Sequence, residues 1–205
     1  MQDVIDQVNA DLKKSRVSTY FLSSRLTYTP ESIRSKIGFS DPKYYPLYYH
    51  LGKYISPKNV LDLSFEAGVA SGCFLISNNT TESFLGFQKQ KNDHYTPTFG
   101  RNNIKAVGKT FHQADVYVGN LEDEEFINKL DKKWDLVIIN KDIGYDEVLT
   151  EMKFIWKYIS DGGHLILDFC NSDKGVDRAL PDFARIMNRE YLQFKSKYKA
   201  AIIKK

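Results

Sequence analysis

The chain has 205 residues, enough for one domain with a substantial core, and its 42% hydrophobic and 14% aromatic content excludes a disordered chain. Its formal net charge of +3 is too small to indicate nucleic-acid binding. No apolar run approaches the roughly 20 residues that a membrane span needs. The first residues are too polar for a signal peptide, so we expect a cytoplasmic protein without a membrane segment. In such a reducing compartment, Cys73 and Cys170, both in apolar stretches, are expected to be buried thiols, not a disulfide.

The chain begins with an amphipathic pattern. Residues 2–14 carry Val4, Ile5, Val8 and Leu12 at helical spacing, which predicts a helix that docks on another surface. Residues 15–42 are irregular and aromatic, with turn signals. A second helix, with a broad apolar face, is predicted for Tyr44–Ile55. We therefore divide the chain into an N-terminal helical and aromatic extension, 1–43, and an α/β domain, 44–205.

Strands and helices alternate through the α/β domain. The strand runs are short, apolar and not strictly alternating, as in strands buried on both faces of a parallel sheet. They are Asn59–Leu63, Ser83–Phe87, Val116–Val118, Leu136–Ile139 and His164–Phe169. Predicted helices lie between them, at Val69–Ser77, Phe99–Lys109, Asp123–Leu130, Tyr145–Tyr158 and Val176–Asn188. This order predicts a doubly wound three-layer sandwich with a mostly parallel sheet, and the last residues, EYLQFKSKYKAAIIKK, predict an antiparallel hairpin at its edge.

Ligands of doubly wound sheets bind at the carboxyl ends of the strands, where the strand order reverses. The candidate site residues are therefore those that follow each strand. They are Asp62–Gly68, Gln88, Gly119–Leu121, Asn140–Asp142 and Asp168–Asn171.

Several landmarks occur together in a characteristic order. YYPLYYHLGKYISPK precedes NVLDL, VYVGNLEDEEFINKL follows, and WDLVIINKDIGYDEVLTEMKFIWKYISDGGHLILDF leads into NSDKGVDRALPDF. With these landmarks, residues 44–205 resemble the class I S-adenosylmethionine-dependent methyltransferases. More narrowly, they resemble the small O-methyltransferase and cephalosporin-hydroxylase-like group. The resemblance implies a Rossmann-like methyltransferase fold with S-adenosylmethionine as cofactor. It also places the double glycine Gly162-Gly163 in a tight turn between a helix and the fifth strand.

The resemblance places the cofactor on the stretch NVLDLSFEAGVASG. Asp62, or an acid near it, would hold the methionine moiety, although the same acid could simply cap the turn. Ser64, Glu66 and Gly68 take the family's three glycine places, where the backbone adopts positive φ and approaches the ligand. The Glu66 carboxylate would face the carboxylate end of the cofactor, point to solvent, or bind the cofactor's amino group.

Two further residues correspond to positions that hold the adenosine. Gln88 stands where the family has an acid that accepts hydrogen bonds from both ribose hydroxyls, so it retains an acceptor without its charge. Asn120 stands where an Asp or Asn faces the adenine amino group. Each has a structural alternative, because Gln88 opens an exposed polar run and Asn120 is a common turn residue.

The remaining candidates concern metal binding and catalysis. Asn140, also a cofactor-binding candidate, stands where metal-dependent members carry Asp, and with Asp168 and Asn171 it could form a Mg²⁺ site of low charge. Isoleucine at 143 replaces the family histidine and cannot transfer a proton. The candidate catalytic groups are therefore Asp142, Asp168 and His94.

Two functions fit these observations. One is an active S-adenosylmethionine-dependent O-methyltransferase acting on a small molecule or a sugar. The other, which we prefer from the sequence alone, is a non-catalytic structural or interaction subunit, for example within a viral particle or another large assembly. That preference rests on the number of site positions that depart from the family pattern. In this second hypothesis the aromatic N-terminal segment would bind a protein partner, and oligomers could form.

Overall fold

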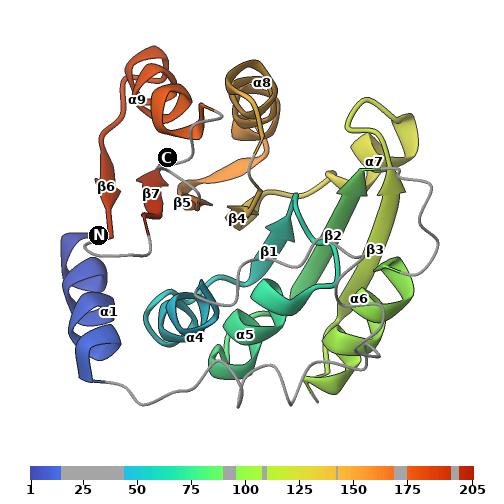
Figure 1. Ribbon diagram of the computed structural model, residues 1–205. Coiled ribbons are helices and arrows are strands. Elements are labelled where there is room, and N and C mark those ends of the chain that lie inside the picture. The colour runs from blue at the N-terminus through green and yellow to red at the C-terminus, as the bar shows by residue number, and fades with distance from the viewer. Residues whose placement is uncertain (15–43, 90–95, 108–109, 142, 169–174, 195–198) are drawn as a thin grey trace.

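The computed structural model describes residues 1–14, 44–89, 96–107, 110–141, 143–168, 175–194 and 199–205. Seven strands form one sheet in the order β3-β2-β1-β4-β5-β7-β6 (Figure 1). The strands are β1 (Asn59–Asp62), β2 (Ser83–Lys89), β3 (Gln113–Gly119), β4 (Trp134–Ile139), β5 (Ile159–Leu167), β6 (Tyr191–Gln193) and β7 (Ala201–Lys204). The first five are parallel, and β7 pairs antiparallel with both β5 and β6. The predicted mostly parallel sheet with a closing antiparallel hairpin is confirmed.

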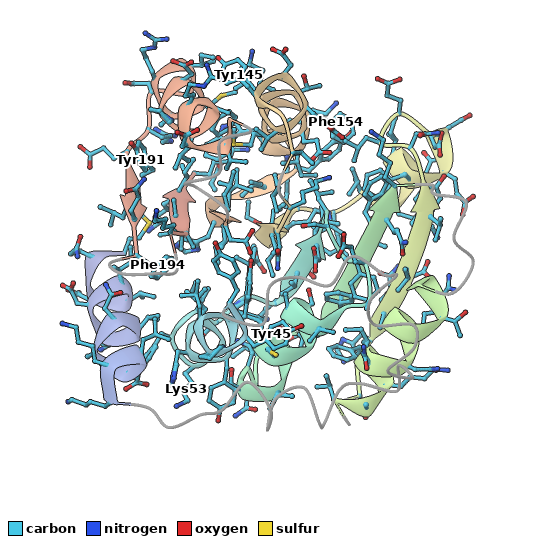
Figure 2. The ribbon with its side chains drawn as sticks, viewed as in Figure 1. Tyr45, Lys53, Tyr145, Phe154, Tyr191 and Phe194 are labelled. Carbon is cyan, nitrogen blue, oxygen red and sulfur yellow. The ribbon has the colours of Figure 1, made fainter. Side chains whose placement is uncertain are left out.

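Helices cover both faces of the sheet. In Figure 1, α1 (Gln2–Lys14), α4 (Tyr45–Tyr54), α5 (Val69–Ser77) and α6 (Thr96–Ala106) lie below it. Above it lie α7 (Glu124–Lys129), α8 (Tyr145–Trp156) and α9 (Val176–Ile186). Figure 2 shows Tyr45 and Lys53 of α4 on the lower side and Tyr145 and Phe154 of α8 on the upper side. The three-layer sandwich expected from the sequence is therefore the observed architecture. None of the helices in the described part of the chain has the length and hydropathy of a membrane span.

The core consists of two apolar clusters, one on each face of the sheet. Successive residues of a strand point to opposite faces. Val60 accordingly joins the cluster under α4 and α5, whereas Leu61 joins the cluster under α8 and α9. Leu136 and Val137 of β4 divide in the same way. Central strands that serve both clusters must be apolar at every position, which is why their sequences do not alternate.

Helix α1 docks on α4 of its own chain. Its Ile5 and Val8 are buried in the lower cluster. A polar contact also holds the C-terminal part of α1, where the Tyr54 hydroxyl of α4 donates a hydrogen bond of 2.9 Å to Asp11 Oδ2. His50 Nδ1 lies 3.2 Å from the same oxygen. The docking surface that the amphipathic pattern requires is thus provided within the chain.

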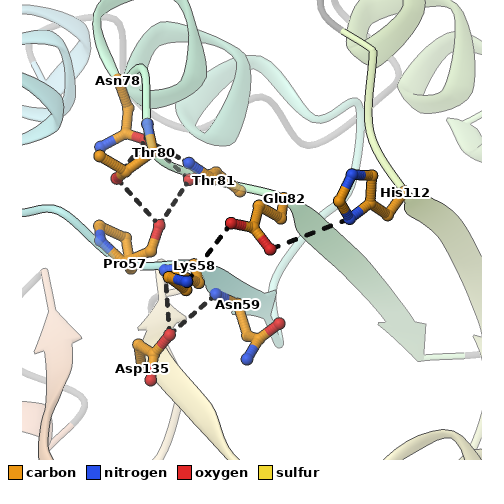
Figure 3. Close-up of polar contacts among 9 residues, drawn as sticks. All are labelled: Pro57, Lys58, Asn59, Asn78, Thr80, Thr81, Glu82, His112 and Asp135. Carbon is orange, nitrogen blue, oxygen red and sulfur yellow. Dashed lines mark hydrogen bonds and ion pairs between the residues drawn. The ribbon is translucent and has the colours of Figure 1, made fainter.

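A polar network joins the amino ends of the strands, opposite the expected ligand edge (Figure 3). Asp135 Oδ2 accepts hydrogen bonds from the backbone N–H groups of Lys58 (2.9 Å) and Asn59 (3.0 Å). The Asn78 side-chain oxygen accepts from the backbone N–H groups of Thr80 (3.0 Å) and Thr81 (2.9 Å). These side chains satisfy backbone donors at strand and loop ends, so the network serves the fold.

The double glycine lies elsewhere than predicted. β5 begins at Ile159, so Gly162 and Gly163 lie inside the strand and not in a turn before it. Trp134 pairs with Ile159, but Leu136 pairs with His164, so β5 contains a bulge between these pairs. Gly162 has φ +80°, a conformation that disfavours any side chain. The glycines therefore permit a bulge, and the predicted helix-to-strand turn is wrong.

Candidate functional site

The candidate site lies at the carboxyl ends of the parallel strands. The strand order reverses between β1 and β4, so ligands are expected beside the ends of these two strands. Four polar side chains are buried along this edge: Asp62, Gln88, Asn140 and Asp168. Asp62 ends β1 and Gln88 belongs to β2, whereas Asn140 and Asp168 directly follow β4 and β5. The structure thus brings together residues that the sequence placed up to about a hundred positions apart.

Asp62 is the centre of a hydrogen-bond cluster. Its carboxylate accepts a hydrogen bond of 2.8 Å from the Ser64 backbone N–H and another from the Ser71 hydroxyl. Burial raises the pKa of Asp62 to about 6, although these hydrogen bonds and the charge of Lys141 favour its ionised form. Asp62 therefore caps the turn, as the structural alternative supposed, and lies at the predicted ligand edge.

Ser64 connects two strand ends. Its hydroxyl lies 3.3 Å from Asp62 Oδ1 and accepts a hydrogen bond from the Asn140 backbone N–H. The first of the three glycine places thus carries a side chain that ties the end of β1 to the end of β4. Serine here preserves the closeness of the two strands where their order reverses.

The loop after β1 has a left-handed backbone at two of the three glycine places. Gly68 has φ +68° and is the N-cap of α5. Glu66 has φ +41°, although left-handed conformations are uncommon for residues other than glycine. The Glu66 side chain is half-buried. Position 66 thus has a positive φ angle, which glycine adopts readily, although a glutamate occupies it.

Replacing Glu66 by glycine is expected to raise the free energy of unfolding by up to about 1 kcal/mol. The left-handed conformation is strained for glutamate, and the greater entropy of glycine in the unfolded chain offsets only part of the relief. Urea denaturation would measure the change. Glu190→Gly, at an exposed position without positive φ, provides the matched control and should be neutral or destabilising. If both variants lose stability equally, the strain at Glu66 is contradicted.

Gln88 and Asn140 are buried with polar atoms that have no partner among the described residues. Gln88 Oε1, Asn140 Oδ1 and Asn140 Nδ2 make no hydrogen bond within the described part of the chain. Gln88 is 6% exposed, so it is not the surface residue that the alternative interpretation supposed. Buried polar atoms are usually paired, and unpaired ones are destabilising. Across the residues described, unpaired buried atoms also occur away from this edge, for example on Asn9 and Trp134, so those of Gln88 and Asn140 are available to a polar ligand without requiring one.

Asp168 accepts a hydrogen bond from a buried tyrosine of the lower helix layer. The Tyr48 hydroxyl of α4 donates a hydrogen bond of 2.9 Å to Asp168 Oδ2. Burial, followed by the negative charges of Asp168 and Asp62, raises the pKa of Tyr48 well above its usual value. Sequence reasoning missed Tyr48, which is one of several tyrosines on an apolar helix. A tyrosine predicted to be buried needs a polar partner, and that requirement was the available signal.

Asn120 belongs to a turn and also lines a pocket. Its backbone N–H donates a hydrogen bond of 2.6 Å to Asp123 Oδ2, in the manner of a turn residue. The pocket, of about 450 Å³, lies between the β3–α7 connection and α8. It is lined by Phe87, Lys89, Asn120, Leu121, Glu122, Asp146, Glu147, Thr150 and Glu151. Both interpretations of Asn120 are therefore compatible with the structure.

Other candidates lie outside the described residues. These are Asp142, His94 and Asn171, together with the aromatic segment after α1. Of the proposed Mg²⁺ ligands, only Asn140 and Asp168 are described, and the described residues contain no group of three or more His, Cys, Asp or Glu side chains arranged for a metal ion. The Mg²⁺ site thus stays a prediction. Ile143, in place of the family histidine, packs against the upper apolar cluster.

The fold is similar to solved methyltransferase structures. The O-methyltransferase from Bacillus cereus in complex with S-adenosylhomocysteine (SAH) is 12% identical, with a TM-score of 0.58 over 91% of this chain and 96% of that chain. The O-methyltransferase TomG from Streptomyces achromogenes, in complex with SAM, is 14% identical, with a TM-score of 0.58 over 95% and 97%. The SAH-bound methyltransferase PaMTH1 from Podospora anserina is 14% identical, with a TM-score of 0.62 over 94% and 95%. The sequence matches no protein-family model and no curated protein sequence.

The protein therefore has the fold of the class I S-adenosylmethionine-dependent methyltransferases, and the resemblance in fold predicted from the sequence is confirmed. Identities of this size show the fold alone. What the site binds and whether it is catalytic follow from the geometry above only as proposals.

Proposed function

We propose that the protein binds S-adenosylmethionine at the carboxyl edge of its sheet and transfers the methyl group to an oxygen atom. The observation that carries the proposal is the loop after β1. Both Glu66 and Gly68 have left-handed φ angles there, although only the second is glycine. Strained backbone conformations of non-glycine residues are concentrated at active sites and ligand-binding sites. The SAM and SAH complexes among proteins of the same fold support the choice of cofactor.

The described residues supply groups for each part of such a cofactor. Asp62 lies at the end of β1, where the methionine moiety would bind. The Gln88 carbonyl oxygen, which has no partner within the described part of the chain, can accept hydrogen bonds from ribose hydroxyls, and Asn120 lines the pocket that would take the adenine. The cofactor supplies an electrophilic methyl group, and the protein orients the acceptor and receives its proton. Among the described catalytic candidates, Asp168 is the group that could receive this proton.

The alternative, a structural subunit without catalysis, rests on the departures from the family pattern. Gln88, Asn140 and Ile143 lack the charge or the proton-transferring group of their family counterparts. However, Gln88 and Asn140 are buried with polar atoms that are unpaired among the described residues, and a polar ligand would satisfy them. We therefore favour the enzyme. A protein partner at the aromatic segment, oligomer formation and a place in a viral or other large assembly stay predictions.

Calorimetric titration with SAM and SAH would test cofactor binding. We expect micromolar affinity for SAH, weakened about two- to tenfold by Gln88→Ala, because one hydrogen bond to a ribose hydroxyl contributes about 0.5–1.5 kcal/mol. Gln193→Ala, an exposed glutamine of β6, is the matched control and should bind SAH as the unmodified protein does. Absence of heat at millimolar ligand would overturn the proposal. A methyl-transfer assay with candidate hydroxylated acceptors would then test the catalytic part.

A further inference from the structure

Glu151 of α8 is a buried carboxylate, and one of its two oxygens is without a partner in the described part of the chain. Lys141 Nζ lies 2.6 Å from Glu151 Oε1. Oε2 has no hydrogen-bond partner among the residues that the structure describes. The side chain is 5% exposed, so water provides little compensation. A buried carboxylate oxygen without a partner is destabilising unless a donor reaches it.

The free oxygen belongs to a residue that lines the pocket between α8 and the β3–α7 connection. Phe87 and Leu121 give this pocket an apolar wall. Lys89 and Glu147 form an ion pair of 3.0 Å among its exposed lining residues. A flat heterocycle can pack on an apolar wall while its polar edge meets the few polar groups of such a pocket.

The charged residues that line this pocket restrict the kind of polar group that a ligand can place in it. Glu122, Asp146, Glu147 and Glu151 are acidic, whereas Lys89 is the only basic residue among the lining residues that the structure describes. The Lys89 and Glu147 charges pair with each other, and the Glu151 charge pairs with Lys141. An anionic ligand edge would meet repulsion from the remaining carboxylates. A neutral edge that carries hydrogen-bond donors fits the pocket better.

We propose that Glu151 recognises the adenine of the cofactor, and that its Oε2 atom accepts a hydrogen bond from the exocyclic amino group of the base. This inference rests on the proposed function and adds a specificity-determining residue on α8, beyond the residues that follow the strands. A purine with an oxo group at the same position presents a carbonyl oxygen to the carboxylate. The two acceptors repel each other, so the site discriminates against that base.

Calorimetry with two ligands tests the inference without any substitution. SAH carries the amino group, and S-inosylhomocysteine, its deaminated analogue, carries the oxo group. We expect the unmodified protein to bind SAH at least about tenfold more tightly than the analogue, because a hydrogen bond to a charged group contributes about 1.5–3 kcal/mol. Equal affinities would overturn the role of Glu151 while leaving the proposed function intact. Binding of neither ligand would overturn both.

The variant Glu151→Gln then tests whether Glu151 causes the preference for SAH over the deaminated analogue. Glu151→Gln retains the shape of the side chain and can turn its amide N–H₂ toward an oxo group, so the preference for SAH should fall severalfold. Glu125→Gln, an exposed glutamate of α7, is the matched control and should retain the full preference. A preference for SAH that is unchanged in Glu151→Gln would contradict the inference. The unfolding midpoint of each variant shows whether a loss of binding reflects a loss of fold.

Discussion

Replacing Phe65 by alanine is expected to lower the free energy of unfolding by about 3–5 kcal/mol. The ring is 2% exposed and fills the space beneath the loop after β1. Three glycines make room for it, because a Cβ atom at Gly68, Gly86 or Gly100 would meet the Phe65 ring. Removing the ring leaves a cavity at the point where this loop, β2 and α6 meet. Urea or thermal denaturation measures the loss.

A double-mutant cycle with Gly86 shows whether the ring is the cause. A Cβ atom at Gly86 would lie 2.5 Å from Cγ of Phe65, and its nearest neighbours all belong to that ring. Gly86→Ala alone is therefore expected to lower stability by about 1–3 kcal/mol through overpacking. In the Phe65→Ala background the same substitution should be neutral or stabilising. Additive effects of the two substitutions would contradict this packing.

The stability that Asp62 confers is expected to fall by roughly 3 kcal/mol as the pH rises from about 3 to about 7. Burial raises the Asp62 pKa from 3.8 to about 6 in the folded protein. The folded state therefore holds the proton more tightly than the unfolded state does. The contribution is fully present below 3.8 and is lost as the pH rises through about 6.

The difference in unfolding free energy between the unmodified protein and Asp62→Asn, measured across this range, isolates that contribution. Asparagine keeps an acceptor for the Ser64 backbone N–H but cannot ionise. Asp131→Asn, at an exposed position, controls for the general loss of one negative charge. A difference that grows with pH would mean that the ionised carboxylate is the stabilised form. A constant difference would mean that the Asp62 pKa is not raised.

Most of the fold follows from local patterns in the sequence. Where the predicted elements differ from the structure, the differences have physical causes. Central strands were found because burial on both faces makes them apolar throughout. β3 begins at Gln113, three positions before the predicted strand, because it is an edge strand whose first residues are exposed. Helix α6 begins at Thr96 and not at Phe99, since a Thr-Pro helix start carries no apolar signal. The bulge at Gly162 depends on pairing with β4, which no local pattern reveals.

The candidate site was predictable in position but not in its contacts. The ends of the parallel strands identified Asp62, Gln88, Asn140 and Asp168 without any tertiary information. Tyr48 and Glu151 were missed because they lie on helices, and only the folded chain brings them to the strand ends. Conversely, glutamate at position 66 suggests a departure from the loop of the family, whereas its positive φ angle is one that glycine adopts readily. Residue identity alone does not determine backbone conformation at such a position.

The docking of α1 on α4 has a consequence for how the chain folds. Ile5 and Val8 complete the lower apolar cluster from a helix that is about thirty residues away along the chain from its partner helix. Closing so long a connection costs entropy before any apolar contact is gained. Since the surface on which α1 packs is formed by α4 and the lower cluster, we expect α1 to join after they have formed. Packing and Asp11 hold that contact, so we expect a chain cut between the two helices to remain a complex of two fragments.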